Sequence, residues 1–228
     1  MLKTAKHKTA ILIFANSAST EFEQKPFAKS AALFEALNKE TLAKVKKTKL
    51  PYFHFTEKEQ LGTSFGERFV NAIQEVYQKG FDTIITIGND SPQLKTAHLL
   101  DAYKQLQLGK TVLGPTFDGG FYLMGLHKAN FDASLFERLP WQRFGLFNRI
   151  SQLFENYNSQ LFRLPVFEDI DTRRDVAILL NFTKALSSFI LFLLNKISSY
   201  LDPIFPKQEN TSHTNFSLSF YNKGSPIL

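Results

Sequence analysis

Short apolar runs alternate along the chain with longer segments in which apolar residues recur every three or four positions. A short apolar run bounded by polar residues is typical of a buried strand, whereas the longer spacing is typical of an amphipathic helix. In "SFGERFVNAIQEVYQKG", Ser64 and Glu67 have capping-box spacing and Gly80 suits a helix end. The pattern predicts strands at 10–15, 51–55, 83–87, 110–114, 121–126 and 160–166, and helices at 26–45, 64–80, 96–107, 143–157 and from about 172.

This alternation of strands and helices indicates an α/β fold, a three-layer α/β/α sandwich around a mostly parallel sheet. In such sheets, ligands bind beyond the carboxyl ends of the strands. Asp90 follows one predicted strand, and Asn16, Ser17 and Ser19 follow the first. We therefore expect these two loops to face one crevice.

The chain changes character after residue 176, where "AILLNFTKALSSFILFLLNKISSYL" precedes a polar tail. We interpret this apolar segment as one long helix. Polar residues between 184 and 195 interrupt it, so no transmembrane segment is predicted. The sequence thus predicts one α/β domain at 1–176 and, at 177–228, an apolar helix and tail packed on the domain or on a partner, as in a homo-oligomer. Weak contact with a membrane surface is the alternative.

Composition narrows the classes of function. The chain has 228 residues, a net charge of +6 and no cysteine. Without cysteine, disulfides, zinc–thiolate sites and thiol nucleophiles are excluded, and a cytoplasmic location is favoured. The excess of lysine lies in residues 1–58, where a solvated helix face explains it better than an anionic partner. We find no nucleic-acid motif, Walker loop or dinucleotide fingerprint, so no nucleic-acid partner is expected.

The stretch "TIITIGNDSPQL" ends a buried strand at Gly88 and presents Asp90 on a loop stiffened by Pro92. A carboxylate held in this way suits a divalent metal, because Mg²⁺ or Mn²⁺ is commonly held by one or two carboxylates while phosphates complete its shell. Capping of a turn or of the next helix is an equally good explanation for Asp90 alone.

The stretch "FEDIDTRRDV" crowds Glu168, Asp169 and Asp171 ahead of a predicted helix. Capping explains Thr172 and Asp175, but it leaves the crowding unexplained, since like charges raise one another's pKa. A metal would relieve the repulsion, as would solvent or the two arginines that follow. We predict that Asp90 and one acid of this stretch hold the metal together.

The stretch "GPTFDGGFYLMGL" places two glycines after Asp118 and before an aromatic-rich strand. A tight hairpin turn is the simpler interpretation of Asp-Gly-Gly, and close approach of the backbone to a ligand is the other.

Taken in order, "GTSFGERF", "IGNDSPQL", "LGPTFDGGFYLMGL", "LPW" and "DIDTRRDV" resemble a bacterial family of small glycosyltransferase-A-like transferases. That family is similar to the nucleotidyltransferases of cofactor biosynthesis, including the molybdenum-cofactor and phospholactate guanylyltransferase types. The resemblance runs from about residue 10 to 176 and implies a nucleotide-diphospho-sugar transferase (GT-A-like) fold. It further implies a metal-dependent glycosyltransferase or nucleotidyltransferase with a nucleotide-diphosphate donor and an acceptor that the sequence does not identify.

The resemblance also implies roles for individual residues. The metal, Mg²⁺ or Mn²⁺, would be held by Asp90 with Asp171 or Asp169, and Asp118 would orient or deprotonate an acceptor hydroxyl. Gly119, Gly120 and Trp141 would lie towards the acceptor. The nucleotide-binding residues would be Asn16, Ser17, Lys25, Glu67, Arg68 and Asn89.

The chain departs from the family in its first loop. Family members carry Pro-x-x-Gly-x-x-Lys-Thr-Arg-Leu there, whereas this chain has "ANSASTEFEQKPFAKS", with Glu21 and Glu23 where positive charge is expected. Lys25 and Lys29 are the only cations in that stretch. Two hypotheses follow: an active transferase with rebuilt donor contacts, or a catalytically degenerate relative that acts as a binding or partner protein.

Overall fold

The structure, a computed structural model, describes residues 7–25, 31–156 and 160–199. The start of the helix predicted at 26–45, Lys29, the end of the helix predicted at 143–157 and the polar tail lie outside the described residues.

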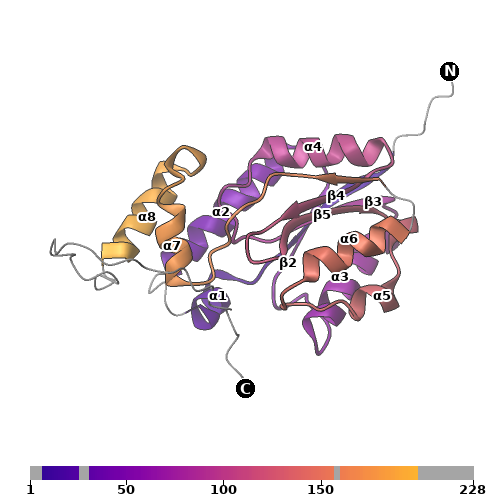
Figure 1. Ribbon diagram of the computed structural model, residues 1–228, viewed down its shortest axis with the longest axis horizontal. Coiled ribbons are helices and arrows are strands. Elements are labelled where there is room, and N and C mark those ends of the chain that lie inside the picture. The colour runs from indigo at the N-terminus through magenta and orange to yellow at the C-terminus, as the bar shows by residue number, and fades with distance from the viewer. Residues whose placement is uncertain (1–6, 26–30, 157–159, 200–228) are drawn as a thin grey trace, which may run out of the picture.

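Six strands form one sheet at the centre of the molecule (Figure 1). They are β1 (Thr9–Phe14), β2 (Tyr52–Phe55), β3 (Thr83–Ile87), β4 (Thr111–Pro115), β5 (Phe121–His127) and β6 (Leu161–Arg163). Their order is β2-β1-β3-β5-β4-β6. Among the described strands, only β5 runs against its neighbours, β3 and β4, and the remaining pairs are parallel. The mostly parallel sheet that the sequence predicts is therefore confirmed.

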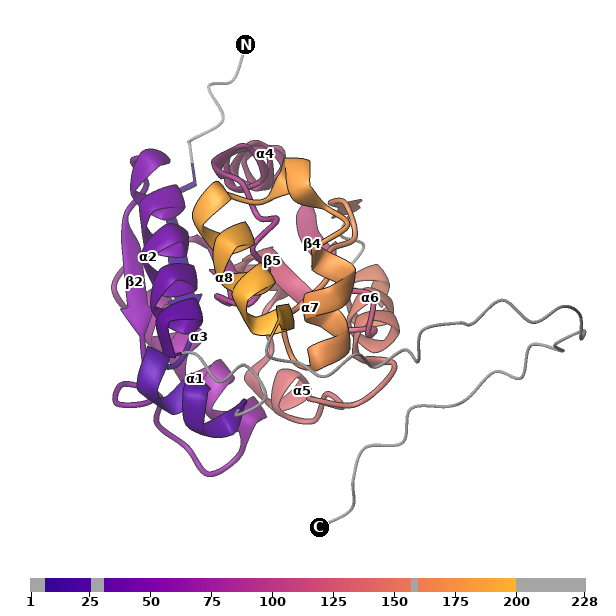
Figure 2. The same cartoon turned by 90° about the vertical axis from the view of Figure 1, so that its left-hand side faces the viewer.

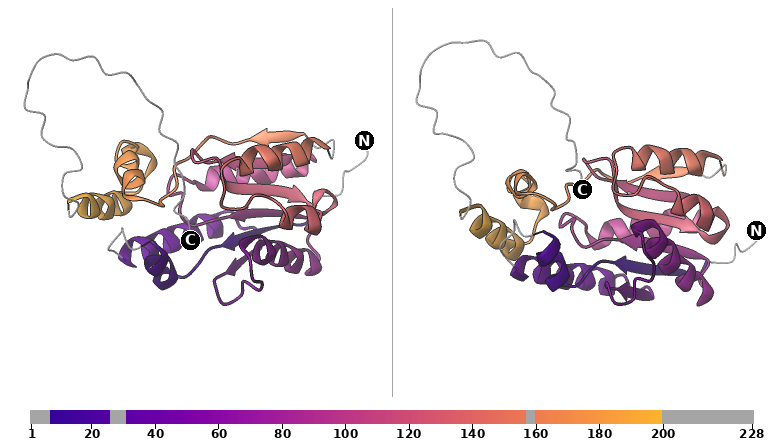
Figure 3. Two further views of the ribbon diagram at one scale, coloured as in Figure 1. Left: turned by 60° about the horizontal axis from the view of Figure 1, so that its bottom comes forward. Right: turned by 90° about the horizontal axis from the view of Figure 1, so that it is seen from below.

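Helices cover both faces of this sheet and one of its ends (Figures 1 and 3). They are α1 (Ala18–Gln24), α2 (Ala31–Lys47), α3 (Phe65–Gln78), α4 (Thr96–Gln107), α5 (Ala133–Glu137), α6 (Leu146–Asn156), α7 (Arg173–Leu179) and α8 (Ser188–Ser199), with short 3-10 turns η2 (Lys128–Asn130) and η3 (Thr183–Ala185).

The strands supply one buried core on each face of the sheet. Leu12 and Ile84 pack with α3, α5 and α6, whereas Ile11 and Ile85 pack with α2 and α4. Neighbouring residues of a strand face opposite ways, so a strand buried on both sides is apolar throughout, as the runs in the sequence are. The three-layer sandwich is confirmed.

The stretch after β1 contains a helix, α1, where the sequence analysis predicts only a loop. Ser17 caps this helix, its hydroxyl oxygen accepting from the Thr20 N–H. The stretch 18–24 contains neither glycine nor proline, so nothing in it opposes a helical turn once the cap is made. α1 brings Glu21 inward, where the residue is only 7% exposed.

The prediction of one long apolar helix after residue 176 is wrong. α7 ends at Leu179, and α8 begins after Ser187, whose hydroxyl oxygen accepts from the Ile190 N–H. That hydroxyl also donates to Glu40 on α2. A serine that caps a new helix and bonds a neighbouring one fixes a break there, although the apolar pattern itself continues.

Beyond the carboxyl edge of the sheet, α8 packs on α2, and α7 packs on α8 (Figure 2). They bury Val176, Leu179, Ile190 and Leu194 in a third apolar cluster shared with α2. Phe189 and Phe192 on the other side of α8 remain 57% and 60% exposed. Among the residues that the structure describes, no helix combines the length and apolar character needed to cross a membrane.

Candidate functional site

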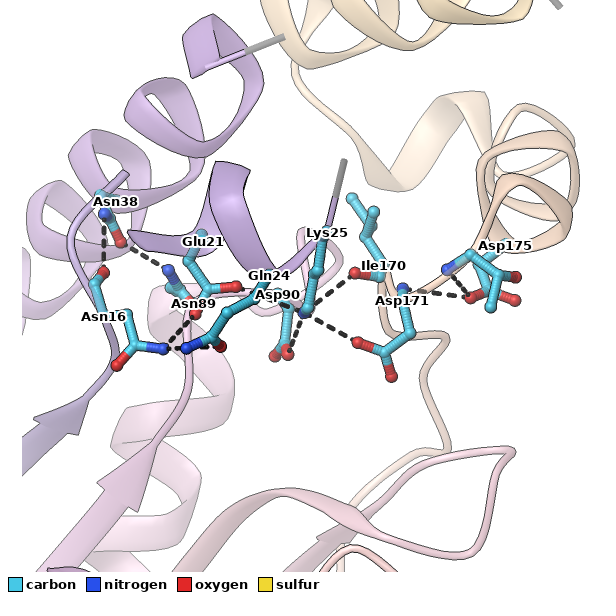
Figure 4. A network of polar contacts seen from close by, with 11 residues as sticks. Asn16, Glu21, Gln24, Lys25, Asn38, Asn89, Asp90, Ile170, Asp171 and Asp175 are labelled. Carbon is cyan, nitrogen blue, oxygen red and sulfur yellow. Dashed lines mark hydrogen bonds and ion pairs between the residues drawn. The ribbon is translucent and has the colours of Figure 1, made fainter. Parts of the chain in front are cut away.

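The loops that follow β1 and β3 lie beside each other, because these strands are parallel neighbours (Figure 4). A chain of amides joins them. Asn89 Nδ2 donates to Asn38 Oδ1 (2.7 Å) on α2, and Asn38 Nδ2 donates to the carbonyl oxygen of Asn16 (3.2 Å). The predicted meeting of these two loops is confirmed.

The segment 167–171 lies against the loop of Asp90 on one side and the β4–β5 turn on the other. The Ile170 N–H donates to the Asp90 carbonyl oxygen, and the Phe167 N–H donates to the Pro115 carbonyl oxygen, each at 3.1 Å. All three acidic stretches of the sequence therefore meet at the carboxyl edge of the sheet.

Lys25, the residue that ends α1, lies at the centre of the acidic side chains (Figure 4). Its Nζ lies 2.8 Å from Asp171 Oδ1, 3.3 Å from Asp90 Oδ2 and 3.5 Å from Glu21 Oε2. It also donates to the Ile170 carbonyl oxygen (3.1 Å). The Lys25 side chain is only 16% exposed. Asp90 and Asp171 thus converge on one cation, a lysine ammonium group, while the prediction that they hold a divalent metal stays a prediction.

Electrostatics keeps this ammonium group charged. Burial lowers the pKa of Lys25, but attraction to Asp90, then to Asp171 and Glu21, outweighs burial and raises the pKa above its ordinary value. For Glu21 the balance is reversed: burial raises the pKa more than Lys25 lowers it, and Asp90 raises it further. The cluster therefore holds a firmly protonated lysine among three carboxyl groups.

Asp169 has a different environment from Asp171. It accepts a hydrogen bond from the Ser91 hydroxyl. Burial raises its pKa well above the usual range, and the charges of Asp90, Asp118 and Asp171 raise it further, against the lowering effect of the Ser91 bond. Of the two acids offered by the sequence as the partner of Asp90, Asp171 is the one that shares a cation with it.

Asp175 serves the backbone. Its Oδ2 accepts from the N–H groups of Thr172 (2.7 Å) and Asp171 (3.1 Å), so it caps α7. This leaves the Asp171 carboxylate to face Lys25. Helix capping therefore explains Asp175, and the ion pair with Lys25 explains Asp171.

Asn16 and Ser17 hold α1 in place. Asn16 Nδ2 donates to Glu21 Oε1 (3.1 Å) and to Gln24 Oε1 (3.3 Å). The N–H and hydroxyl of Ser17 donate to the two carboxylate oxygens of Glu57, at 2.7 and 2.9 Å. These bonds fix the helix that carries Lys25, so both residues shape the site.

The stretch around Asp118 forms the β4–β5 hairpin turn, the simpler of the two interpretations from sequence. The Asp118 carboxylate accepts from the Thr116 hydroxyl and from the Gly120 N–H (3.0 Å). Gly119 has φ +92°, a conformation that favours glycine. Thr116 and Gly119 also line a cavity of about 450 Å³, whose other walls include Phe117, Phe144, Phe147, Asn148 and Arg163.

Trp141 lies in an aromatic cluster at the same edge of the sheet. Its ring centroid is 5.3 Å from that of Phe65 and 5.0 Å from that of Phe69, and its indole N–H donates to the Phe136 carbonyl oxygen (2.8 Å). A Cβ added at Gly66 would lie 2.6 Å from the indole ring, so this glycine allows the close contact. The only hydrogen-bonding group of the indole is thus used inside the fold.

Glu67 and Arg68 lie in the first turn of α3. The Glu67 carboxylate accepts from the N–H and the hydroxyl of Thr63, each at 2.7 Å, and these bonds lower its pKa. The Ser64 oxygen accepts from the Glu67 N–H (3.1 Å), which is the cap that the spacing predicts. Within the described parts of the chain, neither Glu67 nor Arg68 contacts Lys25 through a hydrogen bond or an ion pair, and their place in a nucleotide pocket stays a prediction.

Sequence reasoning missed two contributors to this site. Glu21 looks like a repulsive charge in the sequence, but on α1 it lies one turn before Lys25 and pairs with it. The spacing of four residues was the available signal. Ser91, which bonds Asp169 across 78 positions of the chain, gives no local signal.

The donor set fits a hard divalent cation when phosphates supply the remaining ligands. Asp90 and Asp171 both reach one point, and their carboxylate oxygens are the ligands that Mg²⁺ and Mn²⁺ prefer. Across the described parts of the chain, no three His, Cys, Asp or Glu side chains are grouped to hold a metal ion. The fit therefore concerns two carboxylates, the number commonly used beside a nucleotide.

Comparison with solved structures places the fold. A proposed nucleotide-diphospho-sugar transferase from Desulfovibrio desulfuricans matches 86% of this chain and 100% of its own, at 22% identity and a TM-score of 0.68. Weaker likenesses include a manganese complex of Rv0371c from Mycobacterium tuberculosis, with 13% identity, coverage of 76% and 98%, and a TM-score of 0.47. Another is a cytidylyltransferase from Leptospira borgpetersenii, with 17% identity, coverage of 91% and 100%, and a TM-score of 0.43. The first likeness establishes the nucleotide-diphospho-sugar transferase fold and nothing finer.

No curated protein matches the sequence. Residues 24–143, more than half of the chain, match a family described as "Uncharacterized protein conserved in bacteria (DUF2064)". The match begins next to Lys25 and includes Asp90, Asp118 and Trp141, whereas Asp169 and Asp171 lie beyond it. It spans a shorter stretch than the resemblance drawn from the sequence motifs, and it shows that the chain belongs to the DUF2064 family.

Proposed function

We propose that this protein is a transferase that takes a nucleotide-diphosphate donor, of the glycosyltransferase or nucleotidyltransferase type, and uses Mg²⁺ or Mn²⁺. The observation that carries the proposal is the convergence of Asp90 and Asp171 on one cation at the carboxyl edge of the sheet. Ligands of open α/β sheets bind at that edge. The shared fold with a proposed nucleotide-diphospho-sugar transferase agrees with it.

In this proposal Asp90 and Asp171 hold the metal, with Asp169 behind them as a hydrogen-bonded support. When bound, the metal neutralises charge that develops on the leaving phosphate. The convergence of Asp90 with Asp171 in one ion-pair cluster makes Asp171 a better choice than Asp169.

The nucleotide would lie over the loops after β1 and β3. Lys25 would bind a phosphate, with Asn16, Ser17 and Asn89 forming the floor of the pocket. Glu67 and Arg68 would border the base or ribose. The bonds that these residues already make keep the floor rigid, and a rigid floor lowers the entropic cost of binding.

The acceptor would approach from the hairpin turn. The turn that carries Asp118 lies beside the acidic segment, because the Phe117 N–H donates to the Phe167 carbonyl oxygen (3.1 Å), so a group that contacts Asp118 also lies near the acids. We assign Asp118 the role of orienting or deprotonating an acceptor hydroxyl. The cavity lined by Thr116, Gly119 and Arg163 offers an apolar space beside that turn for the body of the acceptor.

Calorimetric titration with a panel of nucleotide diphosphates and nucleotide-diphospho-sugars, with and without Mn²⁺, tests the proposal. We expect at least one nucleotide to bind in a manner that requires Mn²⁺, and Asp90→Asn to weaken that binding by about tenfold or more. The matched control is Asp101→Asn on α4, where the carboxylate is 51% exposed and, among the described residues, forms an ion pair only with Lys104.

If no nucleotide binds with or without Mn²⁺, the transferase hypothesis is contradicted. The alternative hypothesis, a catalytically degenerate relative that acts as a binding or partner protein, is then favoured. If a nucleotide binds equally well to Asp90→Asn, the metal site is wrong even though the nucleotide site is right.

A further inference from the structure

The Lys25 ammonium group is surrounded by oxygen atoms of the kinds that bind a divalent metal ion. Four oxygen atoms lie within 3.5 Å of Nζ, from Asp171, Ile170, Asp90 and Glu21, and one of them is a backbone carbonyl. Carboxylates and backbone carbonyls are the donors that hard divalent cations take in proteins. A lysine that only stabilises a surface usually has one carboxylate partner, as Lys128 has in Asp82.

From this geometry we propose that Lys25 is a resident cation. It occupies the divalent-metal position in the nucleotide-free protein and yields it only when a nucleotide diphosphate offers its phosphates to the ammonium group. Metal and nucleotide would then bind together, each weakly without the other. The inference rests on the proposed function for the identity of the site, and it adds what occupies the metal position when no nucleotide is bound.

Lys25 and a metal cannot hold this position at the same time. Nζ already lies 2.8 and 3.3 Å from the oxygens of Asp171 and Asp90 that a metal would need. A magnesium-sized ion binds such oxygens at about 2.1 Å, so it would lie in contact with the ammonium group and repel it. One of the two cations must leave.

The resting arrangement also explains why Lys25 does not leave unaided. Glu21, Asp90 and Asp171 would face one another without a cation between them if the ammonium group moved into solvent. Asn16 adds a bond that holds Glu21 in place. Lys25 and Glu21 are the buried members of this cluster, so removing the ammonium group leaves a buried carboxyl group without its cation, which is costly.

A diphosphate changes this balance in two ways. It brings two or three negative charges as new partners for the ammonium group, and it brings the metal that replaces the lysine between the acids. The lysine stem is unbranched and flexible, so the ammonium group can move while α1 stays in place. Because binding linkage is reciprocal, nucleotide would raise metal affinity by the same factor as metal raises nucleotide affinity.

The test measures Mn²⁺ binding without nucleotide, by the electron paramagnetic resonance signal of free Mn²⁺. We expect weak binding to the wild-type protein and binding at least about tenfold tighter to Lys25→Met, which keeps the apolar stem and removes the charge. Lys25→Arg keeps a cation and should bind as weakly as the wild-type protein. The double variant Lys25→Met with Asp90→Asn should lose the gain, because one of the two carboxylates is gone.

Lys44→Met is the matched control. The Lys44 side chain is 19% exposed, and its Nζ donates to the Pro92 carbonyl oxygen and lies 3.7 Å from Glu40, its one carboxylate partner within the described ranges. It is thus as enclosed as Lys25 but not surrounded by acids, and its removal should leave Mn²⁺ binding as in the wild-type protein. Circular dichroism establishes that each variant is folded before titration.

Two results would overturn the inference. One is a folded Lys25→Met protein that binds Mn²⁺ no more tightly than the wild-type protein. The other needs no variant: tight Mn²⁺ binding by the nucleotide-free wild-type protein. Failure of the proposed function would give a different result. If Lys25→Met gains Mn²⁺ binding but neither protein binds a nucleotide, Lys25 is the resident cation and the nucleotide-diphosphate donor is contradicted.

Discussion

Two clusters lie at the carboxyl edge of the sheet, and they differ in what holds them together. β1 ends at Phe14, whose ring joins the aromatic cluster of Phe65, Phe69 and Trp141. Two residues later, Asn16 joins the charged cluster around Lys25. One cluster consists of aromatic side chains, and the other consists of charged side chains that come from α1 and from loops joined by backbone hydrogen bonds.

Both clusters come from motifs that the sequence analysis assigns to one functional region. "GTSFGERF" and "LPW" supply Gly66 and Trp141, and "IGNDSPQL" and "DIDTRRDV" supply Asp90 and Asp171. In the structure the first pair makes a close packing contact and the second pair shares a cation. The two pairs of motifs therefore have different physical roles. The first pair provides close packing, and the second pair provides charges that share a cation.

The largest expected effect is on packing. Trp141→Ala should lower the free energy of unfolding by about 3 kcal/mol, because it empties space beside Phe65 and Phe69 and removes the bond to Phe136. Urea denaturation followed by circular dichroism measures it. Nucleotide affinity of the folded protein should change less than about twofold. A stable Trp141→Ala protein with lost nucleotide binding would move Trp141 from the packing cluster to the ligand site.

A matched pair of acids separates capping from ligand binding. Asp175→Ala removes the acceptor of two backbone N–H groups and should cost about 1 kcal/mol of stability. Asp171→Asn should cost less, since the Asp171 side chain is 48% exposed, but it should weaken Mn²⁺-dependent nucleotide binding by about tenfold or more.

Urea denaturation and calorimetric titration of both proteins make this comparison. If Asp175→Ala loses Mn²⁺-dependent nucleotide binding and Asp171→Asn retains it, then the role of metal ligand has been assigned to the wrong acid.

The last effect is a change in pH dependence. Burial, and then the charge of Asp90, raises the pKa of Asp169 in the folded protein, so the folded state binds this proton more tightly than the unfolded state. The contribution of Asp169 to stability is then greatest at low pH and declines as pH rises above the unfolded pKa of about 3.9. Asp169→Asn cannot titrate. The difference in unfolding free energy between Asp169→Asn and the wild-type protein should therefore grow in favour of the variant as pH rises from 4 to 7.

Urea denaturation at several pH values gives this difference directly. A difference that stays constant between pH 4 and 7 would show that the Asp169 carboxyl titrates normally, and would remove the contrast drawn between Asp169 and Asp171.

Local patterns predicted most of the secondary structure, because strand and helix periodicity depends on neighbouring residues. They located β1, β3, α3 and α4 closely, and they marked the three acidic stretches. They failed where one side chain overrides a pattern that continues through it. Ser187 divides an apolar segment into two helices by capping one and bonding Glu40, and Ser17 starts a helix inside a predicted loop.

The sequence by itself determined an α/β fold, acids at the ends of strands and a first loop without the usual glycine. Tertiary structure alone decided that Lys25 lies among those acids, since Asp90 and Ile170 are 65 and 145 positions away from it along the chain. Parallel pairing of β1 with β3 and the bonds of segment 167–171 bring these positions together. Burial then makes their charges interact strongly, and neither pairing nor burial at such separations can be read from the spacing of residues along the chain.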